Sequence, residues 1–258
     1  MDGDRFRSCF DEWIREQESD LNELLEAMQS ERRESDPQLS ELVEKSMRHY
    51  KEYSEKRRAL AREDGPTFFC PPWCTAFENS FLWLGGCRPT LSIRLLYALS
   101  GYELDAHLDD ILAPGGFAAS FQRGLVGLSA PQLATVNDLH CRTLKEEDRL
   151  SAKMATLQED VADKPLLPIA ADRARRRAEA AEGSGGHEVV EAAMNEHAEK
   201  LAGMVEEADE LRVATLRTLV TEILTPLQAV ELLVAAKQLQ LSVRQWGQRR
   251  DLHHRRRG

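Results

Sequence analysis

The feature that most constrains this chain is the length of its helical patterns. Between Ser129 and Asp163, apolar residues recur at a mixed spacing of three and four, which marks one face of an α-helix. Ser129-Ala130-Pro131-Gln132 has the form of a capping box at the start of this pattern. One helix over the range would be on the order of 50 Å long, because each residue adds about 1.5 Å. A helix of this length favours a bundle.

Shorter and longer patterns of the same kind occupy most of the remaining chain. They cover residues 6–28, 36–62, 77–84, 89–101, 189–224 and 225–246. Thr225-Pro226-Leu227-Gln228 is a second capping box, with proline at the first helical position. No segment has a convincing strand pattern, and neither a repeat nor a regular heptad register persists. The expected fold is therefore all-α: an irregular bundle of long amphipathic helices without a sheet.

The composition predicts one domain with two unusual segments. Residues 1–247 are expected to form a single helical domain. Within it, residues 163–188 combine prolines, a dense arginine run and a glycine-rich stretch, which predicts a flexible insertion. Residues 248–258 carry no apolar stripe, so we expect a disordered basic tail.

Charge and apolar content restrict the partners that this chain can have. Lys and Arg number 34 against 44 Asp and Glu, and a net charge of -10 should repel nucleic-acid phosphates. No apolar run approaches the roughly 20 residues of a membrane span, and no secretory signal is recognisable. Five scattered cysteines fit a reducing compartment better than a disulfide framework. We expect a soluble intracellular protein without membrane contact.

No motif in the sequence indicates catalysis or a metal centre. A P-loop, a GxSxG elbow, an HExxH helix and a dinucleotide fingerprint are all missing. Cys70 and Cys74 have no second ligand pair at a supporting spacing, so packed thiols are favoured over a zinc site. The histidines are dispersed, and the acidic runs are typical of solvated helix faces. An enzyme is therefore not expected.

A glycine pair separates two of the shorter helical patterns. Residues 77–84 have helical spacing, and Gly85 or Gly86 can adopt the left-handed backbone that ends a helix. Pro89 then suits the first position of the next helix, over residues 89–101. The segment predicts a hinge between two core helices.

The same segment makes the chain recognisable. Trp83-Leu84-Gly85-Gly86-Cys87-Arg88-Pro89-Thr90 resembles the WxGGxRPS signature of plant Delay of Germination proteins and of the C-terminal half of TGA-type bZIP factors. Further similar segments follow in one order, at residues 10–13, 49–53, 137–140, 206–212, 224–229 and 245–247. The chain is identified as a member of the Delay of Germination (DOG1-domain) family, in which Trp83, Gly85, Gly86, Arg88 and Pro89 form a structural signature.

This resemblance implies a non-enzymatic regulator of seed dormancy, germination and abscisic acid signalling. In relatives, a matching N-terminal segment is implicated in contacts with type 2C protein phosphatases, and Phe10, Glu12 and Trp13 occupy it here. Two interpretations of Phe10 and Trp13 stay open. At i and i+3 they could anchor a partner with an acidic rim, or they could staple the helix onto the bundle.

The resemblance also draws attention to two positions on the last helix. Relatives are reported to bind haem through two histidines four residues apart, and the matching positions here hold Gln240 and Arg244. Neither side chain can replace an imidazole as an axial iron ligand. We therefore expect no cofactor, haem included.

The basic tail suggests a nuclear localisation signal, a nucleic-acid-binding patch or a solvated tail without a function. Its arginines are Arg249, Arg250, Arg255, Arg256 and Arg257. TGA factors bind DNA through a basic region and zipper that precede the shared domain, whereas residues 1–35 are acidic and contain neither. Direct DNA binding is therefore not expected. The alternative function is a transcription regulator that binds DNA directly or through a bZIP partner; self-association and a nuclear or additional cytoplasmic location stay open.

Overall fold

The computed structural model describes residues 2–29, 36–111, 125–162 and 185–255. Its helices are α1 (Asp2–Gln29), α2 (Asp36–Glu63), α3 (Ala76–Asn79), α4 (Thr90–Ile111), α5 (Ala130–Val161), α7 (Gly185–Arg217) and α8 (Pro226–Arg255). Three short segments complete them: the 3-10 turns η1 (Pro66–Phe69) and η2 (Leu125–Gly127) and the π-helical η4 (Thr218–Ile223). Over these ranges no strand is present, which confirms the all-α prediction.

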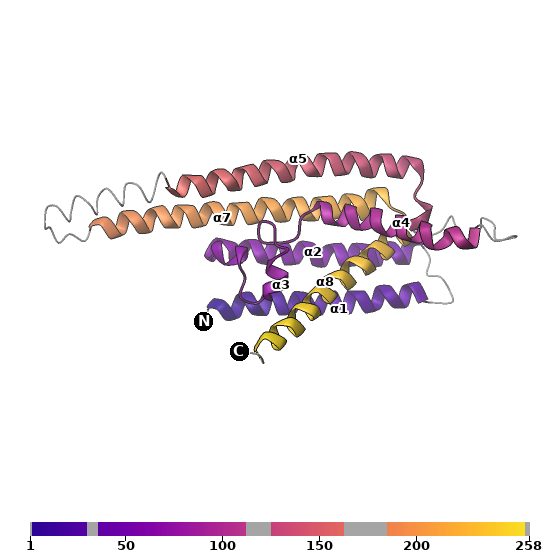
Figure 1. The fold of residues 1–258 in the computed structure, drawn as a ribbon, viewed down its shortest axis with the longest axis horizontal. Helices are drawn as coiled ribbons and strands as arrows, with labels where there is room; N and C mark the ends of the chain where they lie inside the picture. Colours follow the sequence, from indigo (N-terminus) through magenta and orange to yellow (C-terminus); the bar gives the residue numbers. More distant parts are fainter. Residues whose placement is uncertain (1, 30–35, 112–124, 163–184, 256–258) are drawn as a thin grey trace.

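Four long helices lie side by side in one layer, in the order α1, α2, α7, α5 (Figure 1). Helix α8 crosses this layer obliquely over α2 and α1, and α4 lies on the same side beside the first part of α8. The chain thus covers one side of its layer with its last helix. The end of α8 lies near the start of α1 (Figure 1).

The main core lies where α8 and α4 pack onto the layer. It is built by fully buried side chains from several helices, among them Leu24, Met47, Ile93, Leu96, Val136, Leu219, Leu232 and Leu233. Burying one such side chain contributes about 1.5–3 kcal/mol. The apolar stripes of the sequence therefore meet in the space between the layer and its covering helices.

Both predicted capping boxes are confirmed. The Ser129 amide donates to Gln132 Oε1 at 2.9 Å, and the Thr225 amide donates to Gln228 Oε1 at 3.0 Å. Gln132 Nε2 also donates to Gln228 Oε1 at 2.8 Å, so the two boxes share a hydrogen bond. The starts of α5 and α8 are therefore fixed to each other.

The predicted helix over residues 77–84 is wrong, because α3 ends at Asn79. The backbone beyond it closes a tight turn, in which the Trp83 amide donates to the Gly86 carbonyl at 2.7 Å and the Gly86 amide donates back at 3.2 Å. These groups are not free to continue a helix. The next helix begins at Thr90 as expected within one residue, but it passes Gly101 and ends at Ile111.

Two arginines hold this turn, residues 83–87, which we call the glycine loop. Arg212 of α7 donates to the carbonyls of Trp83, Leu84 (3.1 Å) and Cys87 (2.6 Å). Arg57 of α2 donates to the Gly85 carbonyl at 2.7 Å. Asp209 accepts from both guanidinium groups, at 2.8 Å from Arg57 and 2.6 Å from Arg212. The loop therefore joins α2 to α7 through its main-chain oxygens.

The two glycines are required for separate reasons. Gly85 has a φ of +76°, a left-handed conformation that glycine adopts at little cost. At Gly86 an added Cβ would lie 2.8 Å from the guanidinium carbon of Arg212. The preceding Leu84 also has a positive φ, 46°, which is a strained value for a leucine. The loop thus gives Arg212 close access to its carbonyls.

A buried carboxylate fixes the start of α4. Glu147 of α5 is fully buried and accepts from the Thr90 amide at 2.7 Å and from the Thr90 hydroxyl at 3.1 Å. Arg88 pairs with the same carboxylate at 3.2 Å. An anion at a helix N-terminus is stabilised by the helix dipole and satisfies its free amides. Arg88 and Thr90 of the signature therefore connect the glycine loop to α5.

Two predictions about flexible segments are corrected where the structure describes them. Residues 248–255 do not form a disordered tail, because α8 continues without a break to Arg255. Residues 185–188, expected within the flexible insertion, belong to α7. Residues 163–184 and 256–258 lie outside the described ranges. The sequence showed no apolar stripe beyond Gly247, but α8 lacks a helix breaker there and extends past its packed part.

We predict that Arg212→Ala lowers the free energy of unfolding by about 3 kcal/mol, because it removes a charged donor from Asp209 and from three loop carbonyls, of which the Trp83 carbonyl still accepts from the Gly86 amide. The matched control is Arg217→Ala on the same helix, whose ion pair with Glu44 is exposed and should contribute less than about 1 kcal/mol. Urea denaturation followed by circular dichroism measures both. Equal losses in the two variants would contradict the role given to Arg212.

Candidate functional site

Trp13 is a core residue of the described structure. Its side chain is 3% exposed and stacks on Tyr53, with ring centroids 4.4 Å apart and planes at 3°. Tyr50 meets the same indole edge-on at 4.8 Å. Burial raises the pKa of Tyr53 to about 12, so this stack stays neutral at physiological pH. Trp13 therefore staples α1 to α2.

Of the three predicted partner-binding residues, only Glu12 has an exposed side chain. Phe10 is 8% exposed, and the Arg244 guanidinium lies 4.8 Å from its ring centroid. The Glu12 side chain is 49% exposed and accepts from Lys56 Nζ at 2.9 Å. The hydrogen bond from Lys56 lowers the pKa of Glu12. Phe10 and Trp13 thus hold the helix that presents Glu12.

Arg244, one of the two haem-equivalent positions, joins three helices. Its guanidinium lies 3.3 Å from Glu78 of α3 and 3.5 Å from Asp11 of α1. Only 15% of the side chain is exposed. A guanidinium that stays protonated has no lone pair for iron. Gln240, the other of these two positions, is half-buried one helical turn earlier on α8.

A groove runs between α1 and α8 beside Arg244. It encloses about 310 Å³, and Ile14 and Leu241 contribute its apolar part. Asp11, Arg15, Glu18, Arg244, Gln245 and Gln248 complete its lining. Asp11, which lines this α1–α8 groove, precedes Glu12 in the chain. The charged lining of the groove suits a polypeptide segment better than an apolar small molecule.

Sequence reasoning missed a buried charge cluster that links α1, α2 and α8. Lys237 is fully buried, and its Nζ donates to Gln17 Oε1 at 2.7 Å and to Asp20 Oδ2 at 3.0 Å. His49 approaches the same carboxylate with Nδ1 at 3.1 Å, and Tyr50 places its ring 5.1 Å from the ammonium. Burial lowers the pKa of Lys237, which Asp20 opposes.

A sequence signal for this cluster existed. Val230, Leu233 and Lys237 follow the three-and-four spacing of an apolar helix face, and a lysine in such a series is expected to have a buried partner. The partner could not be identified, because Asp20 lies 217 positions away in the chain.

The described part of the basic segment lies on the exposed side of α8. Arg249 and Arg250 are exposed, and the Arg250 guanidinium lies 5.8 Å from the ring of Trp246. Arg255 is the last residue of α8, whereas Arg256 and Arg257 fall outside the described ranges. The structure therefore places one of the five arginines, Arg250, beside an aromatic ring.

Among the described residues, no group of three His, Cys, Asp or Glu side chains could hold a metal ion. Cys70 is exposed and Cys74 is half-buried, and burial raises the Cys74 pKa to about 12. No described helix has the length and hydrophobicity to cross a membrane.

Sequence comparison with known proteins finds a matching family and relatives for this chain. Residues 20–98, which include α2 and the glycine loop, match the DOG1 family of seed dormancy control. Protein DOG1-like 3 of Arabidopsis thaliana is 38% identical over 95% of this chain and 84% of its own length. Protein RESPONSE TO ABA AND SALT 1 of the same plant is 30% identical over 81% of this chain and 79% of its own.

Transcription factors are more distant relatives. TGA4 of Arabidopsis thaliana is 28% identical over 89% of this chain but only 52% of its own length. The similarity to DOG1-like 3 is both higher and nearly complete along both chains. This chain therefore belongs to the DOG1 family.

Proposed function

We propose that this chain is a non-enzymatic regulator of seed dormancy and abscisic acid signalling that acts by binding a type 2C protein phosphatase. The observation that carries the proposal is the 38% identity to a DOG1-like protein along 95% of the chain. A relative whose name refers to abscisic acid and salt supports the signalling context. The proposed location is the nucleus, with a cytoplasmic pool.

The geometry of α1 suggests how such a partner is contacted. Asp11, Glu12 and Arg15 are exposed on the first half of the helix, and Asp11 and Arg15 also line the α1–α8 groove. Trp13 lies on the opposite, buried side and is a positioning residue in this proposal. A partner would meet charged side chains of α1 while Trp13 and Phe10 keep the helix in place.

We predict that Glu12→Lys weakens capture of a recombinant type 2C phosphatase about tenfold, because it reverses an exposed charge within the contact. The control is Glu26→Lys, another exposed glutamate near the far end of α1. Isothermal titration of both variants and the native chain measures the change.

Equal affinity of Glu12→Lys and Glu26→Lys, or no binding by the native chain, would refute this contact. Trp13→Ala serves a different purpose. Removing a buried tryptophan should cost about 3–5 kcal/mol of folding free energy, so lost capture by that variant reports on α1 docking. Its unfolding curve must therefore accompany the titration.

The alternative proposal is a TGA-like transcription regulator, which the similarity to TGA factors supports. It would bind DNA directly or through a bZIP partner. We predict that the chain alone binds duplex DNA more weakly than about 1 µM at physiological salt and loses this binding as salt rises, because its net charge is -10. A mobility shift over a salt series tests this. Tight, sequence-dependent binding by the chain alone would favour the alternative.

We also propose that this chain binds no stoichiometric haem at the positions of Gln240 and Arg244 on α8, because Arg244 is paired with Asp11 and Glu78. Titration with haemin should give no sharp one-to-one endpoint in the Soret band. His253→Ala with His254→Ala is the control for the exposed histidines near the end of α8. A one-to-one endpoint that persists in this control would contradict the proposal.

A further inference from the structure

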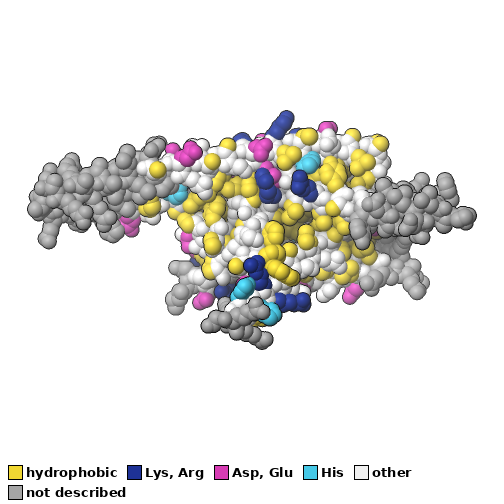
Figure 2. Space-filling view, in the orientation of Figure 1, with side chains coloured by type: hydrophobic (Ala, Val, Ile, Leu, Met, Phe, Trp, Pro, Cys, Tyr) yellow, Lys and Arg dark blue, Asp and Glu magenta, His cyan; other side chains and the backbone are white. Residues whose placement is uncertain are grey.

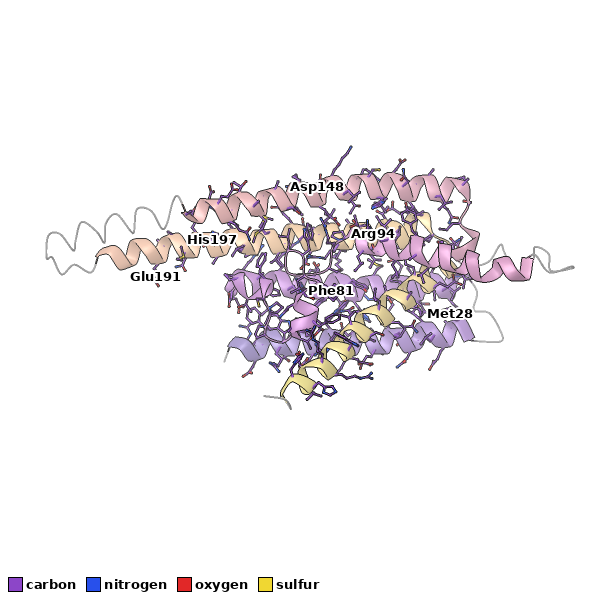
Figure 3. All side chains as sticks on the ribbon, viewed as in Figure 1. Met28, Phe81, Arg94, Asp148, Glu191 and His197 are labelled. Atoms are coloured by element: carbon purple, nitrogen blue, oxygen red, sulfur yellow. The ribbon has the colours of Figure 1, made fainter. Side chains whose placement is uncertain are left out.

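An exposed aromatic cluster lies where α3 meets the second half of α8. Phe81 is 59% exposed and Trp246 is 50% exposed, while Phe77 lies half-buried between them. The Phe77 ring is 4.2 Å from Trp246 and 4.9 Å from Phe81. Leu239, two helical turns before Trp246 on α8, is 41% exposed. Figure 3 labels Phe81 beside α3 and α8. Large apolar side chains rarely gather on a surface without a binding role.

Unpaired arginines border this cluster. Arg249 and Arg250 are exposed and form no ion pair with any residue that the structure describes. Some exposed arginines elsewhere do pair with carboxylates, as Arg5 does with Glu63 at 2.9 Å and Arg149 with Glu146 at 2.8 Å. In Figure 2, basic and histidine side chains gather near the lower end of α8. In a chain of net charge -10, this end of α8 is locally basic.

The cluster is held rigidly. Thr75 forms a capping box with Glu78 that fixes α3, and Glu78 also accepts from Arg244 of α8 at 3.3 Å. Gly247 lets α8 approach closely, because an added Cβ would overlap the Thr75 hydroxyl. Both helices therefore present their aromatic rings in one arrangement. A preformed surface loses little conformational entropy on binding, which favours affinity.

We propose that Phe77, Phe81, Leu239, Trp246, Arg249 and Arg250, the aromatic–arginine face, dock an acidic amphipathic helix of a partner protein. The partner's apolar side chains would cover Phe81, Trp246 and Leu239. Its carboxylates would pair with Arg249 and Arg250, which lack such partners within the described chain. Trp and Arg are the residue types that contribute most often to binding hot spots. This face is separate from Glu12 and does not depend on phosphatase binding.

The ring geometry favours a peptide over single-stranded nucleic acid. Bases bind by stacking on open aromatic faces along a basic channel. Here Phe77 and Phe81 meet at 85°, Phe77 and Trp246 meet at 51°, and Arg250 lies over the Trp246 ring. The rings are tilted against one another, and their exposed parts together with Leu239 form an uneven apolar surface. Such a surface suits aliphatic and aromatic side chains at helical spacing.

The test uses the full chain and a synthetic, fluorescein-labelled helical peptide of about 18 residues with Leu and Phe on one face and Glu elsewhere. A second peptide carries Lys in place of every Glu. Fluorescence anisotropy should show saturable binding of the acidic peptide only. Trp246→Ala and Arg250→Glu should each weaken it about tenfold or more. Phe81→Glu, at the most exposed ring, should do the same if Trp246→Ala fails to fold.

Two matched controls lie on α5. Leu133 is exposed to 42%, and Arg142 is exposed and donates only to the Asp138 carbonyl. Leu133→Ala, Arg142→Glu and Glu12→Lys should each change peptide affinity by less than about twofold. Equal binding of both peptides, or undiminished binding by the Trp246 and Arg250 variants, would overturn the proposal. So would Trp246-dependent self-association in sedimentation, or tighter binding of oligothymidine than of the acidic peptide.

Discussion

The salt-bridged pair of arginines around Asp209 is the interaction on which the rest of the structure depends. Arg57 and Arg212 come from α2 and α7, the central helices of the layer, and both donate to carbonyls of the glycine loop. Because the charges and carbonyls satisfy one another, a polar cluster is tolerated at a largely buried position. The loop in turn directs the chain into α4, where Glu147 accepts a hydrogen bond from the amide of Thr90, the first residue of the helix. Loop, layer and covering helix are thereby joined.

The sites discussed above lie on the two sides of one helix. Toward the layer, α8 meets α1 through Lys237, Arg244 and Leu241, and this contact forms the α1–α8 groove. Toward solvent, the same helix presents Trp246 and Arg250. The α3 segment supports both sides, since Glu78 binds Arg244 and Phe77 packs on Trp246. A scaffold of this kind can contact two different partners without changing its fold.

Local patterns in the sequence predicted the long helices and both capping boxes, because caps and apolar spacing depend on neighbours in the chain. They did not predict the glycine loop. Its conformation depends on Arg57 and Arg212, which lie 28 and more than 100 residues away. The same limit applies to Trp13, whose burial requires Tyr53 of another helix. The spacing of Phe10 and Trp13 could not show whether they bind a partner or fix α1 to the bundle, since both roles place apolar side chains on one helix face. Conversely, α8 continues to Arg255 although residues 248–255 have no apolar stripe.

The buried Lys237 also determines where α8 can lie along its own axis. Apolar contacts are non-directional, so they oppose a shift of α8 along its axis less sharply than a buried charge does. A shift by one helical turn would move the ammonium about 5.4 Å from Asp20 and Gln17, and an unpaired buried charge costs several kcal/mol. Slippage is therefore penalised at a single point near the middle of the helix. The contacts of Lys237 therefore fix the axial position and the rotation of α8, and with them the placement of its outward side chains.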